Sequence, residues 1–405
     1  MIKQFRGTHK QIALLDSVYT HRVFDAMLKS GHAVASPDGE HIAILKARNK
    51  WGWNLEVDGK TEASPVWYSL GYRRFQPRLL GILPDGILLA GALADGREGV
   101  FFSKRDGTLL HYSSCEEIVG VQQSASGPLV FARSLSDSED ERRFILPSLG
   151  TDVHIHRQAF VTGISSGRAL VLDTIEGRLH RYLVGPDGFS DVAIVPVVQG
   201  DPPIGIVCAY GVYLLAIAGT SFSKLFALGK HSWDLGERSF NIEGTIEYLW
   251  QSPTHRTYAF LTRIEKAKET IRALCLGTDI LHVGSFTMGS NDLVWSPNGS
   301  HIGAKIRTKS KEEGQEVSSL VNRKQEFRCR NSELEIDEFC VGNNGSLWSW
   351  IMRSGPYHCA FVGEREHDKV EYAWNMRLLA DGSVGYNCLY GAKVMSIIDR
   401  TDVRS

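Results

Sequence analysis

The stretch Ser36-Pro37-Asp38-Gly39 decides the fold, because variants of it recur along this chain of 405 residues. It returns as Leu83-Pro84-Asp85-Gly86 and as Ser296-Pro297-Asn298-Gly299, each time after a short extended stretch and before an apolar one. Proline presets φ in such a turn, the aspartate or asparagine accepts a local backbone hydrogen bond, and glycine adopts positive φ at low cost.

The turns follow one another at nearly constant spacing. Weaker copies fill the gaps between the three clear ones, and the equivalent positions are Gly39, Gly86, Gly127, Gly167, Gly211, His255, Gly299, Gly345 and Gly382. Successive positions are 47, 41, 40, 44, 44, 44, 46 and 37 residues apart. A period near 44 residues indicates a repeat architecture in which each repeat is one supersecondary unit.

Each repeat contains several short strand patterns. In the first repeat, His41–Leu45 is mostly apolar, and Trp53–Val57 alternates between apolar and polar residues as a half-buried strand does. Asp58-Gly59 is a second hairpin signal, and Val66–Tyr68 supplies a further strand. Four strands in about 45 residues is the size of one β-propeller blade.

These residues resemble a known repeat. The segment His32–Lys46, followed by Trp53–Gly59, is similar to the WD40-like β-propeller repeat of TolB-type proteins, which pairs a Ser-Pro-Asp-Gly turn with a later Val-Asp-Gly turn. Leu293–Gly299 is the next best copy, whereas the modules from Gly127 to Gly211 keep only the spacing. The resemblance implies a propeller fold and says almost nothing about function. The Trp-Asp pair of true WD40 repeats does not recur.

We therefore expect residues 1–405 to form a single all-β propeller domain. Residues 31–405 would carry the modules, in about eight four-stranded blades, with seven to nine also compatible. Nine turns are visible, but propellers usually have four to eight blades, so we expect the short step before Gly382 to mark a different kind of hairpin.

The ends of the chain are expected to close the propeller. Residues 1–30 would supply a closing strand and a lead-in, with Ile12–Leu15 paired to the C-terminal strand near Val394–Ile398, because an open sheet leaves exposed edges. Residues 308–330 are rich in charge, and we expect them to form a long solvated hairpin that projects from its blade.

Composition argues against several classes of partner. A net charge of −1 gives no electrostatic reason to bind nucleic acid or an anionic membrane, and Glu326 interrupts the basic run Arg323–Arg330. No apolar run reaches the roughly 18 residues of a membrane span, and the short run Ile12–Leu15 does not read as a signal peptide. The seven scattered cysteines are expected to be free buried thiols, which favours a reducing, cytoplasmic location.

Three local patterns could carry chemistry, and each has a simpler explanation. Gly163–Gly167 matches the Gly-x-Ser-x-Gly nucleophile pattern, but a strand pattern follows it rather than a helix. His154 and His156 share a strand face without a third ligand at an indicative spacing, and Cys329 and Cys340 are too far apart for a zinc pair. We therefore expect no catalytic residue, no metal site and no cofactor.

Two classes of function remain. We favour a non-catalytic scaffold that binds another protein, as a subunit of a larger assembly. The alternative is a hydrolase or lyase that acts on a glycan or peptide at the mouth of the channel, because propellers can assemble a site from several blades. The candidate contact residues are the hairpin tip Asn49, Lys50 and Trp51, and the charged run Lys309, Lys311, Glu312 and Glu313. Trp51 is the best surface candidate because it lies between two strands.

Overall fold

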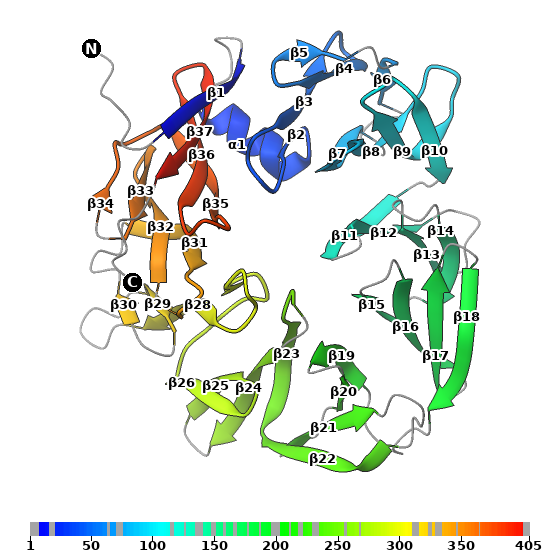
Figure 1. Cartoon of the computed structure of the whole chain (residues 1–405), viewed down its shortest axis with the longest axis vertical. Helices are drawn as coiled ribbons and strands as arrows, with labels where there is room; N and C mark the ends of the chain where they lie inside the picture. Colours follow the sequence, from blue (N-terminus) through cyan, green and yellow to red (C-terminus); the bar gives the residue numbers. More distant parts are fainter. Residues whose placement is uncertain are drawn as a thin grey trace. The chain divides into compact units, whose positions relative to one another are not determined.

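The structure is a computed structural model, drawn in Figure 1. It describes residues 8–15, 21–62, 65–69, 76–113, 117–124, 127–133, 141–146, 151–156, 159–164, 168–175, 178–185, 188–195, 203–209, 212–217, 222–228, 235–254, 257–266, 269–309, 316–322, 326–328, 334–345, 347–363 and 365–399. The chain divides into two compact units. The N-terminal unit comprises Lys10–Ala193 and Cys388–Ser396, and the C-terminal unit comprises Met1–His9, Ile194–Asn387 and Ile397–Ser405.

The N-terminal half of the chain contains the single helix of the described residues and the strands up to β18. These elements are β1 (Thr8–Leu14), α1 (His21–Ser30), β2 (Ala33–Ala35), β3 (Ile42–Ala47), β4 (Gly52–Val57), β5 (Lys60–Thr61), β6 (Trp67–Tyr68), β7 (Arg78–Leu83), β8 (Gly86–Ala92), β9 (Glu98–Lys104), β10 (Leu109–Ser113), β11 (Glu117–Ser124), β12 (Gly127–Arg133), β13 (Glu141–Leu146), β14 (Thr151–His156), β15 (Phe160–Ile164), β16 (Arg168–Ile175), β17 (Arg178–Gly185) and β18 (Gly188–Val195).

In the second half, the regular elements among the described residues are all strands. They are β19 (Pro203–Ala209), β20 (Val212–Ile217), β21 (Phe222–Leu228), β22 (Leu235–Glu243), β23 (Thr245–Gln251), β24 (Tyr258–Lys266), β25 (Glu269–Leu276), β26 (Asp279–Gly284), β27 (Leu293–Trp295), β28 (Ile302–Lys309), β29 (Glu316–Val321), β30 (Glu326–Arg328), β31 (Leu334–Val341), β32 (Leu347–Ser354), β33 (Tyr357–Val362), β34 (Arg365–Glu366), β35 (Tyr372–Leu378), β36 (Val384–Tyr390) and β37 (Lys393–Asp399). The chain is therefore nearly all-β, as the sequence predicts.

The described strands form consecutive modules, and most modules are separate four-stranded sheets. From β11 to β34, each sheet consists of four strands in chain order. The first two modules, β2–β6 and β7–β10, belong to one nine-stranded sheet, in which Tyr68 of the short β6 pairs with Ala92 of β8. The last module has the order β1-β37-β36-β35. Grouped in this way, the described strands make nine modules, at the upper end of the expected range.

All nine recurring turns take the same place in their modules, because each lies in the sequence between the first and the second strand. The turn at Gly382 is no exception. It connects β35 to β36, its φ is +82°, and the Gly382 N–H donates to the Leu379 carbonyl over 3.0 Å. The expectation that this turn belongs to a different kind of hairpin is therefore wrong. A short spacing reflects a short module, not a different one.

The Ser-Pro-Asp-Gly letters form one hydrogen-bonded device, seen in two copies. In the first copy, the His41 N–H donates to Ser36 Oγ over 3.0 Å, and the Gly39 N–H donates to the Ser36 carbonyl over 2.8 Å. In the later copy, the His301 N–H donates to Ser296 Oγ over 3.0 Å, and the Gly299 N–H donates to the Ser296 carbonyl over 2.8 Å. The serine therefore satisfies a backbone donor that the tight turn would leave unpaired.

Within the C-terminal unit, the turns of successive modules also bond to one another. Ser252 Oγ donates to the Gly299 carbonyl over 2.8 Å, and Thr254 Oγ1 donates to the Asn298 carbonyl over 3.0 Å. The Asn298 N–H in turn donates to Asn343 Oδ1 over 2.9 Å. These bonds span 44 to 47 residues of sequence, so they give the repeat period a structural reason.

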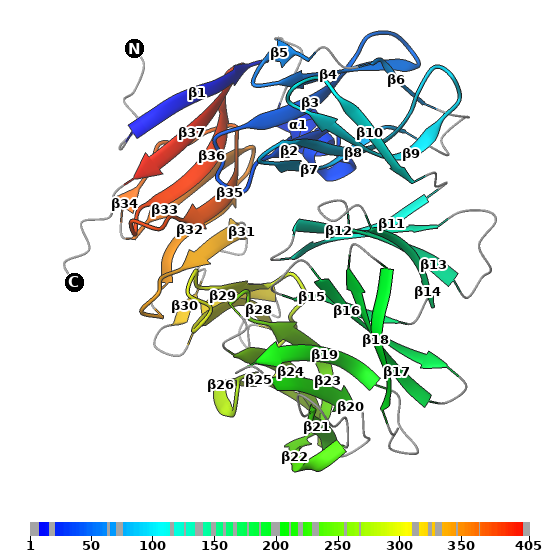
Figure 2. The ribbon, with the colours of Figure 1, turned by 45° about the vertical axis from the view of Figure 1, so that its right-hand side comes forward.

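The N-terminal strand pairs with the last strand, as the sequence predicts. β1 is the neighbour of β37 in its sheet (Figures 1 and 2). At one end of the pair, Thr8 Oγ1 donates to the Ile398 carbonyl over 3.2 Å, and at the other the Leu15 N–H donates to the Ala392 carbonyl over 2.7 Å. Whether this pairing closes a ring stays a prediction.

Residues 21–30 form a helix, where the sequence predicts only a lead-in. The helix α1 buries Phe24 and Met27, which lie three residues apart on one face, and an ion pair of 2.7 Å joins Lys29 to Asp25 one turn away. Gly31 follows the helix with φ of +75°, and the His32 N–H donates to the Met27 carbonyl. This is the usual way in which a helix ends at a glycine.

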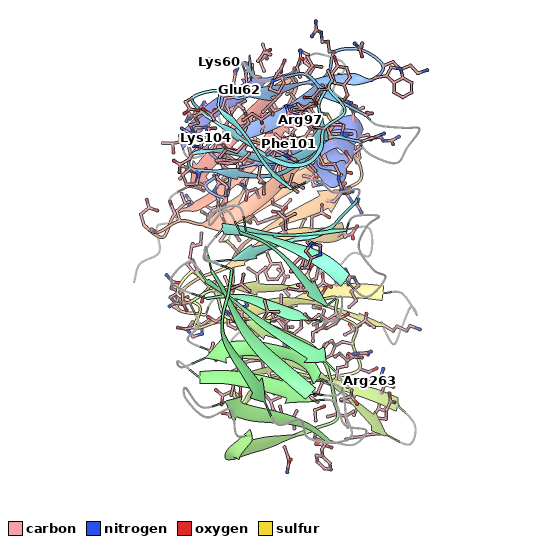
Figure 3. All side chains as sticks on the ribbon, turned by 90° about the vertical axis from the view of Figure 1, so that its right-hand side faces the viewer. Lys60, Glu62, Arg97, Phe101, Lys104 and Arg263 are labelled. Atoms are coloured by element: carbon pink, nitrogen blue, oxygen red, sulfur yellow. The ribbon has the colours of Figure 1, made fainter. Side chains whose placement is uncertain are left out.

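The cores are aliphatic and aromatic. In the N-terminal unit, Leu45, Leu55, Trp67, Leu89 and Phe101 form part of one buried cluster, with Phe101 labelled in Figure 3. The four cysteines whose side chains the structure describes, Cys275, Cys340, Cys359 and Cys388, are free and buried as expected. Burial raises the pKa of Cys275 to about 11 and the pKa of Cys340 to about 12, so neither thiol is a ready nucleophile.

Candidate functional site

The hairpin tip Asn49–Trp51 connects β3 to β4 and has a fixed backbone. Asn49 Oδ1 accepts hydrogen bonds from the N–H groups of Trp51 and Gly52, at 3.0 and 2.7 Å. The Trp51 carbonyl accepts a further bond from the Ser69 N–H over 3.0 Å. Such a turn, closed by the asparagine side chain, positions the residues that follow it without help from a partner.

Trp51 is exposed at this tip. Its exposed fraction is 41%, which makes it one of the large hydrophobic residues that the described chain leaves in solvent. The Lys50 ammonium lies over the indole ring, 5.0 Å from the ring centre. A cation over an indole is attracted by the π face, and the pair can present an apolar surface with a charged border. The sequence-based choice of Trp51 as a surface residue is therefore confirmed, while its binding role stays a prediction.

By contrast, only part of the charged run 308–330 lies in the described residues. Lys309 is the exposed last residue of β28 and pairs with Glu316 in register. Lys311, Glu312 and Glu313 lie outside the described residues. Residues 316–321 and 326–328 are β29 and β30, the third and fourth strands of their module. Those strands belong to the sheet itself, and residues 310–315, 323–325, 329 and 330 lie outside the described residues.

The patterns that we set aside as chemistry lie in ordinary strand contexts. The Gly163–Gly167 segment connects β15 to β16, which pair antiparallel, so no helix follows the pattern. His154 is exposed on β14. Among the residues that the structure describes, no group of three or more His, Cys, Asp or Glu side chains could hold a metal ion. The one helix among the described residues, α1, is not long and apolar enough to cross a membrane.

Sequence reasoning missed a buried polar network in the C-terminal unit. His367 Nδ1 lies 2.8 Å from the Tyr386 hydroxyl, and His367 Nε2 lies 2.9 Å from Asp399 Oδ2. Arg365 reaches the same Asp399 oxygen over 3.2 Å. Although a tyrosine, a histidine and an aspartate in series suggest acid–base chemistry, the His367 and Asp399 side chains are only 1% and 4% exposed. Such burial points to a structural role, because substrate could not reach these groups.

Sequence reasoning also missed a group of charged side chains in the C-terminal unit, which bonds to the neighbouring module. Asp292 accepts from Arg307 over 2.9 Å and lies 3.4 Å from Lys305 Nζ. Lys305 Nζ also donates to the Ile336 carbonyl of the next module over 3.1 Å. The Asp292 and Lys305 side chains are mostly buried, and burial of two charges costs free energy. The hydrogen bond from Lys305 to Ile336, which crosses a module boundary, offsets part of that cost.

Glu338 of β31 belongs to a second inter-module contact. Its Oε2 accepts from the Met376 N–H of β35 over 2.8 Å. Desolvation raises the pKa of Glu338 above its ordinary value, against the opposing effect of that bond. Nearby, Asn375 adopts φ of +57° and donates to Asn387 Oδ1 over 3.0 Å. No local motif signals this group, because its members come from three different strands.

The comparisons with known proteins find distant similarity to solved structures alone. No protein-family model matches the chain, and no curated protein matches it. Among solved structures, the Dos1 propeller is 11% identical with a TM-score of 0.42, covering 90% of this chain and 95% of that one. The Cps50 (Swd1) β-propeller domain of Myceliophteria thermophila is 12% identical with a TM-score of 0.38, covering 78% and 93%. Porphyromonas gingivalis dipeptidyl peptidase 4 is 10% identical with a TM-score of 0.46, covering 93% and 67%. We draw no argument from structures this distant.

Proposed function

We propose that this chain is a non-catalytic interaction module, which binds a protein partner through the hairpin tip Asn49–Trp51. The observation that carries the proposal is the exposure of Trp51 on a backbone that three hydrogen bonds fix. An indole that is already positioned loses little conformational entropy on binding, and buried tryptophans are among the strongest anchors of protein interfaces. Lys50 would add orientation and a faster association rate rather than affinity.

The proposal includes the architecture that would present this tip. We infer that the nine modules form a WD40-like propeller of the TolB type, closed by the pairing of β1 with β37. The repeated turns and the antiparallel meanders support this arrangement, and so do the turn-to-turn bonds of the C-terminal unit. We place the protein in the cytoplasm, because the four cysteines with described side chains are free thiols. We also propose that it is a subunit of a larger assembly.

A hydrolase or lyase acting on a glycan or peptide stays as the alternative, favoured by one observation. Glu338 is a carboxyl group whose pKa desolvation raises, which is what a general acid requires near neutral pH. Against this reading, its Oε2 already accepts the Met376 N–H, so part of its bonding capacity serves the contact between modules.

The two functions are separated by one set of variants. The wild type, Trp51→Ala and Tyr357→Ala would each be used to capture partners from the native host, with mass spectrometry to identify them. Tyr357 is the matched control, since it is also an exposed aromatic, at 48%. We expect a stoichiometric partner that Trp51→Ala loses and Tyr357→Ala keeps. If Trp51→Ala keeps every partner, while Glu338→Gln abolishes a turnover measured on glycan or peptide substrates, the alternative replaces the proposal.

A further inference from the structure

A cavity of about 270 Å³ lies within the N-terminal unit, between the first and the second module. Its apolar lining comes from both modules and includes Leu55, Val57, Ile82, Leu83 and Ile87. Leu55 and Ile87 are almost fully buried, so their side chains form the inner wall, or floor, of the cavity. A cavity of roughly 150 Å³ is enough for a molecule the size of benzene, so this one can take a larger apolar group.

Charged side chains surround this apolar floor. Lys60, Lys104 and Arg105 line the cavity together with Asp58 and Glu62. Lys60, Glu62 and Lys104 lie on the same side of the N-terminal unit in Figure 3. Of the ion pairs between described residues, none involves Lys60, Lys104 or Arg105. Lys104 also acts electrostatically on Asp106, which is fully exposed and does not line the cavity, so the three cations can still contact a ligand.

The carboxylates do not neutralise the three cations. Asp58 is already bonded, because its Oδ2 lies 2.7 Å from His41 Nδ1 and its Oδ1 accepts the Ile42 N–H over 2.9 Å. Glu62 is the one other acid of the lining. Among the lysines, the arginine and the carboxylates of the lining, three cations stand against two anions, and this excess suits a ligand with a single negative charge.

The sequence of the second turn also differs from the other turns at a residue that lines this cavity. In the turns at Ser36, Ser252 and Ser296, the first residue is a serine that forms hydrogen bonds. The second module has Leu83 at this position, and Leu83 lines the cavity. An apolar side chain thus replaces the hydroxyl at the boundary of two modules. Lys60 lies on the short strand β5, which pairs with β4 of the first module.

From this geometry, we propose that the cavity binds a small organic monoanion, with one carboxylate on an apolar body at least as large as a benzene ring. The apolar body would lie on Leu55, Leu83 and Ile87, and the carboxylate would accept hydrogen bonds from the Lys104 and Lys60 ammonium groups. Charge-assisted bonds of this kind are stronger than neutral ones, and the apolar floor excludes water from one side of them. This site is distinct from the Asn49–Trp51 tip and does not depend on it.

Titration calorimetry with phenylpropanoate and its neutral analogue phenylpropanamide tests the proposal. The two probes share the same apolar body, so their difference in affinity reports the carboxylate. We expect the wild type to bind phenylpropanoate about tenfold more tightly, which is the effect of one charge-assisted bond. Lys104→Met keeps the apolar stem and removes one of the two ammonium groups, so it should lower the affinity for phenylpropanoate and leave the affinity for the amide unchanged.

Three further variants make the result specific. Lys29→Met is the matched control, because Lys29 is exposed on α1 and does not line the cavity, and it should bind as the wild type does. Leu83→Ser restores the residue of the other turns and should weaken both probes. Trp51→Ala should bind phenylpropanoate normally, which separates this site from the proposed interaction surface. The proposal is overturned if the wild type binds neither probe or both equally, or if Lys104→Met keeps the wild-type affinity for the anion.

Discussion

His367 Nε2 lies 2.9 Å from Asp399 Oδ2, and both side chains are almost completely buried although 32 residues separate them in the sequence. The contact joins the end of one module to the last strand of the next, and the Tyr386 hydroxyl completes it at the other ring nitrogen. A buried charge is costly unless it is paired and hydrogen-bonded, so each of these groups depends on the others.

Removing one partner of this pair should be strongly destabilising. We expect Asp399→Ala to lower the free energy of unfolding by roughly 3 to 5 kcal/mol, because it leaves His367 and Arg365 without their common acceptor. The control is Glu335→Ala, which removes a partner of Arg353 from an ion pair that is about half exposed and should cost less than about 1 kcal/mol. Urea unfolding of both variants measures the difference. Equal losses would show that burial does not distinguish the two pairs.

The recurring turns should also differ in how well they tolerate a side chain. Gly299 has φ of +66°, and a Cβ there would collide with the hydroxyls of Ser252 and Thr254 in the preceding turn. Gly382 has φ of +82°, but nothing lies within 4 Å of an added Cβ. We expect Gly382→Ala to cost about 1 kcal/mol from backbone strain alone, and Gly299→Ala roughly 3 kcal/mol. Thermal unfolding of the two variants checks this order, and a larger loss at Gly382 would contradict it.

The sequence predicts the parts of this fold that depend on neighbouring residues. The repeat period and the position of each turn can be predicted from residues such as Ser36 and Gly39. The hydroxyl of Ser36 bonds within the turn, and Gly39 adopts the positive φ that the turn requires. The helix α1 could have been found, since Phe24 and Met27 are spaced for one helix face and Gly31 provides a stop. The usual range of blade numbers was a poor reason to discount the turn at Gly382.

The candidate sites could be predicted only where a single hairpin contains them. Asn49 and Trp51 are two residues apart, so the exposed tip was visible in the sequence. The cavity combines Lys60 and Lys104 from different modules, and the buried pair joins His367 to Asp399, so no local pattern contains either. Leu83 in the place of a serine was a visible departure, but its meaning depends on which side chains surround it.

Deleting the first strand should reduce the stability of its sheet. β1 pairs with β37, and Ile12, Ala13 and Leu15 are buried in this sheet, so removal of residues 1–16 would expose β37 as an edge and open apolar surface to water. We expect a lower melting temperature by circular dichroism. Deletion of residues 1–7 is the control, because it leaves β1 complete and should keep the wild-type value. If the longer truncation also melts at the wild-type temperature, the N-terminal strand does not stabilise the fold.

Glu338 should make stability depend on pH in a direction that its environment fixes. Desolvation raises the pKa of Glu338 in the folded state above the ordinary value of 4.5, so the folded protein favours the protonated carboxyl. An acid whose pKa is raised on folding stabilises the protein most below its ordinary pKa of 4.5. This contribution falls as the pH rises through the folded-state pKa and does not change at higher pH. Glu338→Gln keeps an oxygen that can accept the Met376 N–H but carries no charge to desolvate. We therefore expect this variant to be more stable than the wild type at neutral pH, and the gain to vanish in acid. Urea unfolding of both proteins from acid to neutral pH measures the gain. A variant that is less stable at neutral pH would show that the carboxylate contributes more through its hydrogen bonds than it loses by desolvation.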